Sequence, residues 1–258
     1  MVNKVVTGSD IQSREVEEAF EQDATSIGAM HGSARGKRNV SLRIAAFERL
    51  EDLGGERLLD IGCGTGEYTT TLAEHYTEVD GIEIERLRLE AFERNKPDNV
   101  ALHLMSANEM NFEDDTFDTV VMIEVLEHLS DPVTALTEIA RVLKPEGRLL
   151  LTTPSRRWPL EQHGVLFRGK RYPSYYAPGL VWAKPLHKKM SDAAAFEPSD
   201  LRGLAEQSGL KVEGITFMMP PLDSLPAGHK AHTATDLIGE RVSNFFGQTI
   251  VASLSPTK

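Results

Sequence analysis

Short apolar runs alternate with helix-forming stretches through the middle of the chain. The apolar runs are rich in branched residues and have the length of strands that are buried on both faces of a sheet. They lie at about 57–61, 78–84, 100–105, 117–123 and 147–153, and helices are expected between them at about 66–75, 85–95 and 132–143. Regular alternation of strand and helix is typical of parallel sheets. The pattern therefore predicts a doubly wound, Rossmann-like α/β fold.

Further elements are expected on both sides of this alternating core. One helix begins at a capping box formed by Ser9 and Gln12, and a second covers about 39–52. Beyond the core, helices are expected at 198–208 and 235–245 and strands at about 211–218 and 248–254. We therefore expect a seven-stranded sheet in a domain covering 56–258. A helical cap at 1–55 would precede it, and an insert at about 155–196 would form a lid.

Composition and charge limit the class of protein. Of the 258 residues, 40% are hydrophobic and 26% are charged, which is ordinary for a globular protein. No run approaches the roughly 18 apolar residues of a membrane span, and residues 1–18 lack the apolar segment of a secretory signal. The single cysteine excludes an internal disulfide and suits a reducing compartment, so we expect a cytoplasmic protein. The formal net charge of -11 disfavours a nucleic-acid partner.

The most informative motif is a glycine loop at the end of the first expected strand. Asp60 ends that strand, and the spacing of the loop is G-x-G-x-G. Dinucleotide-binding loops are spaced G-x-G-x-x-G, and a carboxylate beside the loop would repel pyrophosphate but suits an ammonium or hydroxyl group. We therefore predict a ligand with an amino acid end and a ribose. The predicted contacts are Asp60, Gly62, Cys63, Gly64 and Gly66, with Cys63 as a small packing residue.

A second acid lies at the end of the next expected strand. Glu83 follows the glycine loop by about 20 residues, where a carboxylate can accept both hydroxyl hydrogens of a ribose. Dinucleotide-binding folds use an acid at the same place, so Glu83 alone does not separate the two kinds of ligand. Ile84 is assigned to the same site, and Glu85 is the second choice for the ribose contact.

Polar groups also follow the third and fourth expected strands. The third strand is followed by Ser106-Ala107-Asn108. The fourth strand ends at Ile123 and is followed by Glu124-Val125-Leu126-Glu127-His128. Glu124 and Glu127 or His128 would share one face of a helical turn. Three interpretations of His128 remain open. It could be a general base, with Glu127 as a further catalytic candidate, it could be a metal ligand, or it could be structural.

Together these motifs resemble those of class I S-adenosylmethionine (SAM)-dependent methyltransferases, in the methyltransferase 11 or UbiE/UbiG-like group. The resemblance covers about residues 40–155 through its motifs and about 195–254 through pattern only. It implies SAM as the ligand, with Ile123 next to the reactive sulfonium and Glu124 at the same strand end. It also implies that Ser106, Ala107 and Asn108 contact the adenine, although Ser106 replaces the acid of the family.

Two more roles follow from the resemblance. Arg43 stands where UbiG-like chains have an arginine near the cofactor, and it could pair with the methionine carboxylate. The Glu-x-x-Glu-His stretch is associated in those chains with a divalent cation. Glu124, Glu127 and His128 are therefore candidate ligands, and an oxygen-rich site would suit Mg²⁺.

The insert after the fifth strand reverses the local charge of an acidic chain. Residues 162–191 contain no Asp or Glu. Basic and aromatic residues are interleaved there, namely Arg168, Lys170, Arg171, Lys184, Lys188 and Lys189 with Phe167, Tyr172, Tyr175, Tyr176 and Trp182. We expect this insert to bind an anionic or sugar-like acceptor through Trp158, Glu161, His163 and Tyr172. Contact with an anionic membrane surface and a merely charge-neutralising loop are the alternatives.

The resulting hypothesis is an enzyme that methylates a small molecule. A hydroxyl of a sugar-like, quinone-like or phenolic compound is the favoured acceptor, with nitrogen or carbon acceptors as alternatives. A non-catalytic SAM-binding protein and a nicotinamide-dependent oxidoreductase are the rivals from other classes. The oligomeric state is not predicted.

Overall fold

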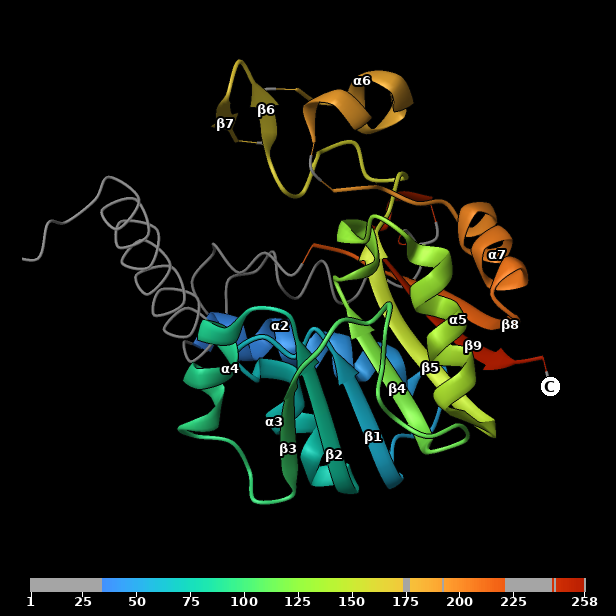
Figure 1. Ribbon diagram of the computed structural model, residues 1–258. Coiled ribbons are helices and arrows are strands. Elements are labelled where there is room, and N and C mark those ends of the chain that lie inside the picture. The colour runs from blue at the N-terminus through green and yellow to red at the C-terminus, as the bar shows by residue number, and fades with distance from the viewer. Residues whose placement is uncertain (1–33, 174–176, 192, 221–242, 244, 258) are drawn as a thin grey trace, which may run out of the picture.

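A computed structural model describes residues 34–173, 177–191, 193–220, 243 and 245–257 (Figure 1). The expected N-terminal helix after Ser9 lies outside the described residues, as does most of the helix expected at 235–245. The described part contains a large sheet with helices on both faces, and a smaller group of elements above one edge of that sheet.

The large sheet has seven strands in the order β3-β2-β1-β4-β5-β9-β8. The strands are β1 (Gly55–Ile61), β2 (Tyr76–Glu83), β3 (Val100–Leu104), β4 (Phe117–Ile123), β5 (Leu143–Pro154), β8 (Leu210–Met218) and β9 (Thr249–Pro256). Strands β1 to β5 are parallel, and β9 runs antiparallel to both β5 and β8. The predicted seven-stranded, Rossmann-like fold is confirmed, and the last strand makes the sheet mixed.

Successive residues of the buried strands point to opposite faces, and each face has its own apolar core. Leu58 of β1 belongs to the core formed with α2 (Ala34–Glu48), α3 (Glu67–Leu72) and α4 (Arg86–Glu93). Leu59 belongs to the core formed with α5 (Pro132–Val142) and α7 (Pro198–Gln207). The strands are apolar throughout because both of their faces are covered.

Element ends follow local capping chemistry. Asp131 accepts the backbone N–H of Thr134 and caps α5, whose first residue is Pro132, as the sequence predicts. The fifth strand was expected at 147–153, but β5 begins already at Leu143, with a shift of register between Phe117 and Thr119 of its neighbour β4. The helix expected at 39–52 begins earlier and ends at Glu48.

The insert after β5 forms a compact group of its own. It contains the antiparallel hairpin of β6 (Val165–Phe167) and β7 (Lys170–Tyr172), the short helix η4 (Leu180–Trp182) and α6 (Lys184–Met190). Because β5 ends at Pro154, the insert rises from the carboxyl edge of the parallel strands (Figure 1). Val165, Leu180, Val181 and His187 are buried within it. Among the described residues, no helix has the length and apolar character needed to cross a membrane.

Candidate active site

The glycine loop lies between β1 and α3. In the sheet, β1 has β2 on one side and β4 on the other, so the loop lies at the point where the strand order switches direction. All three glycines have positive φ, with values of 72° at Gly62, 57° at Gly64 and 88° at Gly66. A Cβ at Gly62 would lie 2.5 Å from Val125, and one at Gly66 would lie 2.1 Å from the Phe92 ring. A Cβ at Gly64 would meet no atom closer than 3.8 Å. A Cβ at Gly64 would therefore fit without a clash, and a ligand can approach the backbone there more closely than at Gly62 or Gly66.

Glu83 ties this loop to the end of β2. The N–H of Gly64 donates to its Oε2 over 3.1 Å, and the N–H groups of Ile84 and Glu85 donate to its Oε1 over 2.8 and 3.0 Å. An ionised carboxylate has about four acceptor positions, so ribose hydroxyls can still donate to it. Ile84 follows Glu83, and 70% of its surface is exposed, which is unusual for a large apolar residue. Its side chain therefore offers an apolar surface to a ligand.

Asp60 lies buried beneath the loop. Its Oδ2 accepts the hydroxyl hydrogen of Thr69 over 2.6 Å. Burial raises the pKa of Asp60 to about 7, the hydrogen bond from Thr69 lowers it, and the charges of Glu67 and Glu83 raise it further. A carboxylate in this surrounding lacks a cation among the described residues that contact it. A ligand ammonium group would supply one.

The segment expected to contact adenine is held by local bonds. Asn108 N–H donates to the Ser106 hydroxyl over 3.2 Å, and the Asn108 side chain donates to the backbone carbonyl of Asp131 over 2.8 Å. Ala107 is buried in the core on the α5 face, and Cys63 is buried in the other core, in accord with its interpretation as a packing residue. Ser106 thus sits at the surface of this group.

Arg43 and Glu124 form an ion pair between α2 and the end of β4, with Nη2 and Oε1 3.0 Å apart. The guanidinium also donates to Tyr68 over 2.6 Å and to Asn39 over 2.9 Å. Burial by itself lowers the pKa of Arg43, but the charge of Glu124 and the contacts with Tyr68 outweigh it and raise the pKa. The sequence reasoning missed Tyr68, although its place as the second residue of the helix after the loop is a usable signal.

Glu124 is also fixed from the sheet side. Its backbone has φ 54°, a left-handed conformation that is uncommon for a residue other than glycine. Its N–H donates to the backbone carbonyl of Thr152 over 3.1 Å, and the Thr152 hydroxyl donates to its Oε1 over 2.9 Å. The turn brings the Glu124 carboxylate to Arg43.

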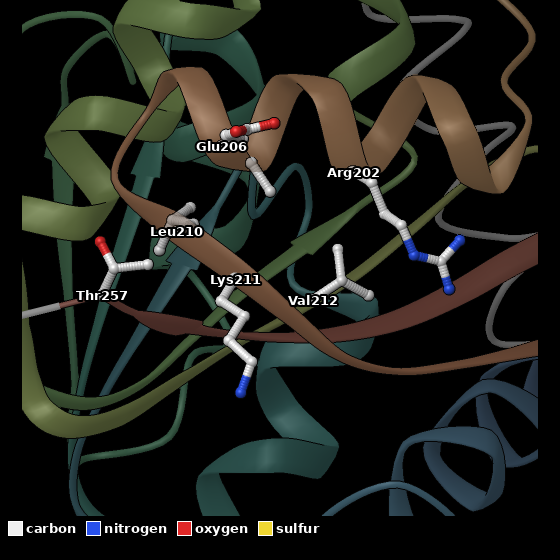
Figure 2. Close-up of a pocket in the computed structure, with 7 residues that line it drawn as sticks. Arg202, Glu206, Leu210, Lys211, Val212 and Thr257 are labelled. Carbon is white, nitrogen blue, oxygen red and sulfur yellow. The ribbon is translucent and has the colours of Figure 1, made fainter.

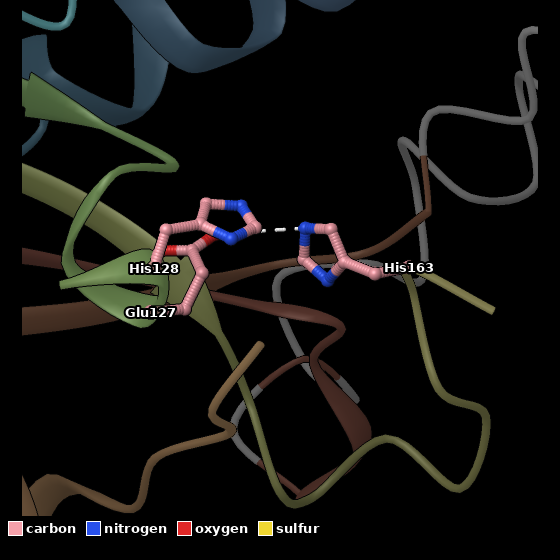
Figure 3. Close-up of side chains that lie close together, drawn as sticks. All are labelled: Glu127, His128 and His163. Carbon is pink, nitrogen blue, oxygen red and sulfur yellow. Dashed lines mark ion pairs between the residues drawn. The ribbon is translucent and has the colours of Figure 1, made fainter. Parts of the chain in front are cut away.

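Glu127, His128 and His163 lie together above the end of β4 (Figure 3). One ligand atom from each residue lies within 4.8 Å of the others. His163 Nε2 is 3.9 Å from Glu127 Oε1, and the rings of His128 and His163 meet edge to face with their centroids 4.8 Å apart. Glu127 is buried, and its Oε1 accepts no hydrogen bond within the described part of the chain. Burial, followed by the charge of Glu124, raises the pKa of Glu127 well above its usual value.

The predicted acceptor contacts fall at different places in the insert. Glu161 is buried and bonded to His187, and it accepts the backbone N–H of His163 over 3.0 Å. Trp158 is half-buried near the start of the insert, where its backbone N–H donates to the backbone carbonyl of Ser155. Tyr172 lies on β7, in the hairpin that projects from the body (Figure 1). The fold therefore brings His163 to the catalytic candidates and leaves Tyr172 on the hairpin.

Two other pockets are lined by residues other than Glu127, His128 and His163, and the second of them includes Leu126, which precedes Glu127. One, of about 430 Å³, is lined by Arg202, Glu206, Leu210, Lys211 and Thr257 among others (Figure 2). Leu210 pairs with Pro256, whereas Thr249 pairs with Pro154 at the carboxyl end of β5. This pocket therefore opens at the opposite edge of the sheet. The second, of about 550 Å³, lies between α5, α7 and residues 194–196 and includes Leu126 and Arg156.

Comparison with known proteins places these features in a family. Residues 59–151 match the family model described as a methyltransferase domain. The chain is 34% identical over 174 residues to the O-methyltransferase cnsE of Penicillium expansum, covering 65% of this chain and 56% of that protein. It is 30% identical over 184 residues to the ubiquinone biosynthesis O-methyltransferase of Aromatoleum aromaticum, covering 69% and 73%. The chain spans about half the length of the first relatives that it matches, at 56% and 49%.

Solved structures support the same fold. A SAM-dependent methyltransferase from Mesorhizobium loti superimposes with a TM-score of 0.57 at 18% identity. The alignment covers 82% of this chain and 95% of that one. At this identity the likeness bears on the fold alone.

Proposed function

The chain belongs to the class I SAM-dependent methyltransferase family, and on that premise we propose that it transfers the methyl group of SAM to a hydroxyl oxygen of a small molecule. The observation that carries the proposal is the pairing of an open glycine loop with an acid–imidazole cluster. Gly64 and Glu83 form the first, and Glu127, His128 and His163 form the second. Both lie at the carboxyl edge of the same sheet. The two relatives named as O-methyltransferases support oxygen as the acceptor atom.

The residues around the loop fit SAM. Glu83 would accept the ribose hydroxyls beside the open face of Gly64, and Ile84 would cover one side of the adenosine. Buried Asp60 would pair with the ammonium group, which matches the pKa of about 7 that it has without a cation. Arg43, with its guanidinium beside Glu124, would lie near the methionine end. SAM, when bound, supplies a methyl group on a positively charged sulfonium.

The segment proposed to contact adenine departs from the family motif at Ser106. Ser106 stands at the surface of the expected adenine segment and would contact the base through its hydroxyl, beside Ala107 and Asn108. Ile123 is the last residue of β4, and the Val125 side chain packs against the Cα of Gly62. These apolar groups would keep water from the reacting atoms.

His128 is our candidate for the general base. An imidazole can take the proton of an acceptor hydroxyl near neutral pH, which oxygen methylation requires at some stage. Glu127 lies buried beside it, and burial followed by the charge of Glu124 raises the pKa of Glu127. A positive charge on His128 would be stabilised beside these two carboxylates. Replacing His128 with Ala should lower kcat by about a hundredfold and leave the Kd for SAM unchanged.

A bound dication is the second candidate for activating the acceptor. Among the three ligands expected from the motif, Glu124 pairs with Arg43, while His163 of the insert joins Glu127 and His128. Two imidazoles and one carboxylate suit a transition-metal dication better than Mg²⁺, which prefers oxygen ligands. Such an ion would lower the pKa of an acceptor hydroxyl. Dialysis against a chelator, followed by metal analysis and by addition of Zn²⁺, Mn²⁺ or Mg²⁺, tests this candidate.

The insert would supply the acceptor's other contacts. Its exposed aromatic residues include Trp182 at 60% and Phe167 at 50%, and Lys184, Lys188 and Lys189 of α6 are exposed beside them. Such a surface favours an anionic aromatic acceptor over a neutral aliphatic one. We therefore propose a phenolic or quinone-like acceptor that carries a carboxylate or phosphate. A membrane surface with anionic lipids would have the same charge, and vesicle sedimentation separates the two cases.

One pair of measurements tests the proposed function. Scanning fluorimetry with SAM, S-adenosylhomocysteine and NAD should show stabilisation by the first two only, and stabilisation by NAD alone would refute the cofactor. Transfer of label from [methyl-¹⁴C]SAM to small molecules of a cell extract should then yield products with a methoxy group. Labelled products with only N-methyl or C-methyl groups would instead favour the alternative acceptors. SAM binding without any transfer would favour a non-catalytic protein.

A further inference from the structure

A buried carboxylate in the insert lies between two histidines that come from separate segments. Glu161 Oε2 is hydrogen bonded to Nε2 of His187 in α6. Its Oε1 accepts the backbone N–H of His163 over 3.0 Å and lies 3.5 Å from His163 Nδ1. Only 3% of Glu161 and 6% of His187 are exposed. Both carboxylate oxygens are therefore engaged within the insert, which explains Glu161 better than the direct acceptor contact expected from the sequence.

The pairing of charges keeps this carboxylate ionised. Burial by itself raises the pKa of Glu161, but the nearby His163 ring, the hydrogen bond with His187 and the backbone N–H of His163 outweigh burial and hold the pKa well below its ordinary value. A buried charge destabilises the fold unless hydrogen-bond or ionic partners compensate it. Removal of either histidine would leave the Glu161 carboxylate buried with fewer partners. The three side chains thus form one unit.

The unit gives the His163 ring a direction. Nδ1 lies 3.5 Å from Glu161 Oε1. Nε2, on the other side of the ring, faces Glu127 Oε1 at 3.9 Å (Figure 3). A carboxylate at Nδ1 favours the tautomer with its proton there and the lone pair at Nε2, which is a common way to orient a functional imidazole. The lone pair then faces the space shared with Glu127 and His128.

The insert is also anchored where this direction matters. The N–H of Ala194 donates to the backbone carbonyl of Glu127 over 3.0 Å, and the Gln162 side chain donates to the backbone carbonyl of Gln248 over 2.7 Å. Glu161 and His187 stand on either side of the β6–β7 hairpin, so their bond closes the base of that hairpin. The contacts hold the two ends of the insert against the body.

We propose that Glu161 is a positioning residue for the transfer reaction. Locked by His187, it turns His163 so that Nε2 faces the acceptor side of the site beside Glu127 and His128. The inference rests on the proposed function as far as catalysis is concerned, while the orientation of His163 stands by itself. The insert thereby contributes an imidazole that the strand-end motif of the family does not contain.

The orientation is measured directly by nuclear magnetic resonance. Long-range ¹H–¹⁵N spectra of the full chain with ¹⁵N-labelled histidine report which ring nitrogen carries the proton, and the spectrum of His163→Gln assigns the resonance. In the unmodified chain His163 should be the Nδ1–H tautomer. Glu161→Ala should shift it to the Nε2–H tautomer, which is preferred by a free histidine. Glu161→Asp keeps a carboxylate and should retain the Nδ1–H form. Glu206→Gln, at an exposed carboxylate of α7, should match the unmodified chain.

The catalytic part is tested with SAM and 3,4-dihydroxybenzoate as a phenolic probe. Glu161→Ala and His163→Gln should each lower kcat by about tenfold to a hundredfold, with the KM for SAM unchanged. The double variant should be no slower than the slower single one, because the first acts through the second. Partial recovery is expected for Glu161→Asp.

The outcomes separate the two proposals. An unchanged His163 tautomer in Glu161→Ala would overturn the positioning role, as would multiplicative losses in the double variant. A tautomer shift without any methylation of the probe would retain the orienting role of Glu161 and count against a phenolic acceptor. If Glu161→Ala does not fold, the tautomer and kcat of Glu161→Asp and of His187→Asn decide the question.

Discussion

The Arg43 guanidinium and the Glu124 carboxylate form an ion pair across the carboxyl edge of the sheet, with Nη2 and Oε1 3.0 Å apart. The pair joins α2 to the turn after β4, so the helix before the sheet becomes part of the site. Glu124 is thus paired with Arg43, while His163 joins Glu127 and His128 in the acid–imidazole cluster. One contact therefore ties both α2 and the turn after β4 to the proposed cofactor site.

Removing one partner of this pair should cost stability. Arg43→Met leaves the Glu124 carboxylate without its cation, with side-chain exposures of only 11% and 23% for the two residues. We expect the free energy of unfolding to fall by about 2 kcal/mol, less than for a fully buried pair. The double variant with Glu124→Gln should recover most of the loss. Urea denaturation measures both, and equal destabilisation by the single and double variants would contradict a specific pairing.

Glu83 and Glu85 provide a matched test of the ribose contact. The Glu83 carboxylate accepts the N–H groups of Gly64, Ile84 and Glu85, whereas the Glu85 side chain forms an ion pair with Arg88 at 3.2 Å. Glu83→Gln should weaken SAM binding by about tenfold or more, because a hydrogen bond between a charged acceptor and a hydroxyl is lost. Glu85→Gln should leave the Kd within about twofold. Calorimetric titration with SAM gives both values, and the reverse order would move the role to Glu85.

Replacement by alanine should affect SAM binding at Gly64 and the stability of the fold at Gly66. Gly64→Ala adds a Cβ that meets no protein atom within 3.8 Å, so its cost to folding should be only the strain of positive φ, about 1 kcal/mol. That Cβ would occupy ligand space and weaken SAM binding strongly. Gly66→Ala would place a Cβ 2.1 Å from Phe92 and should destabilise the fold itself. Melting temperatures with and without SAM distinguish the two effects, and equal loss of stability in both would count against an open face at Gly64.

Asp60 should make the stability of the SAM-free protein depend on pH. Its folded pKa of about 7 lies above the ordinary 3.8, so its contribution favours folding at pH below 3.8 and is lost as the pH rises to about 7. Asp60→Asn should therefore raise the free energy of unfolding of the SAM-free protein at pH 8 by about 1–3 kcal/mol. The gain should shrink as the pH falls below 7.

The same residue should have the opposite effect on SAM. An ionised Asp60 attracts the ammonium group, so SAM affinity should rise between pH 6 and 8 in the unmodified chain. Asp60→Asn should bind SAM more weakly at pH 8 and show little pH dependence. Titrations at several pH values test this, and a parallel pH dependence in both proteins would assign the effect to another group.

The basic surface of α6 should act on the acceptor alone. Lys184, Lys188 and Lys189 are exposed, while His187 of the same helix faces Glu161. Replacing the three lysines with Glu should raise the KM for an anionic phenolic acceptor by about tenfold and leave the Kd for SAM unchanged. Raising the salt concentration should reduce the difference, because exposed charges are screened. An unchanged KM would return these lysines to the role of charge compensation.

The sequence by itself determined the sheet and the glycine loop with the two acids beside it. Apolar runs of strand length define β1, β2, β3 and β4 because both faces of the sheet are covered, and glycine spacing defines the loop because φ at these positions is positive. Asp60 and Glu83 follow from the same local order, since parallel strands end at one edge.

The acceptor side was decided by tertiary contacts between distant segments. Pattern put Glu124 with Glu127 and His128, but a turn with φ 54° sends Glu124 to Arg43 on another element. His163 reaches His128 only because the insert folds back over the sheet edge, and Glu161 meets His187 across the hairpin. No local periodicity encodes such contacts. They depend on which buried charges find partners once the chain has packed.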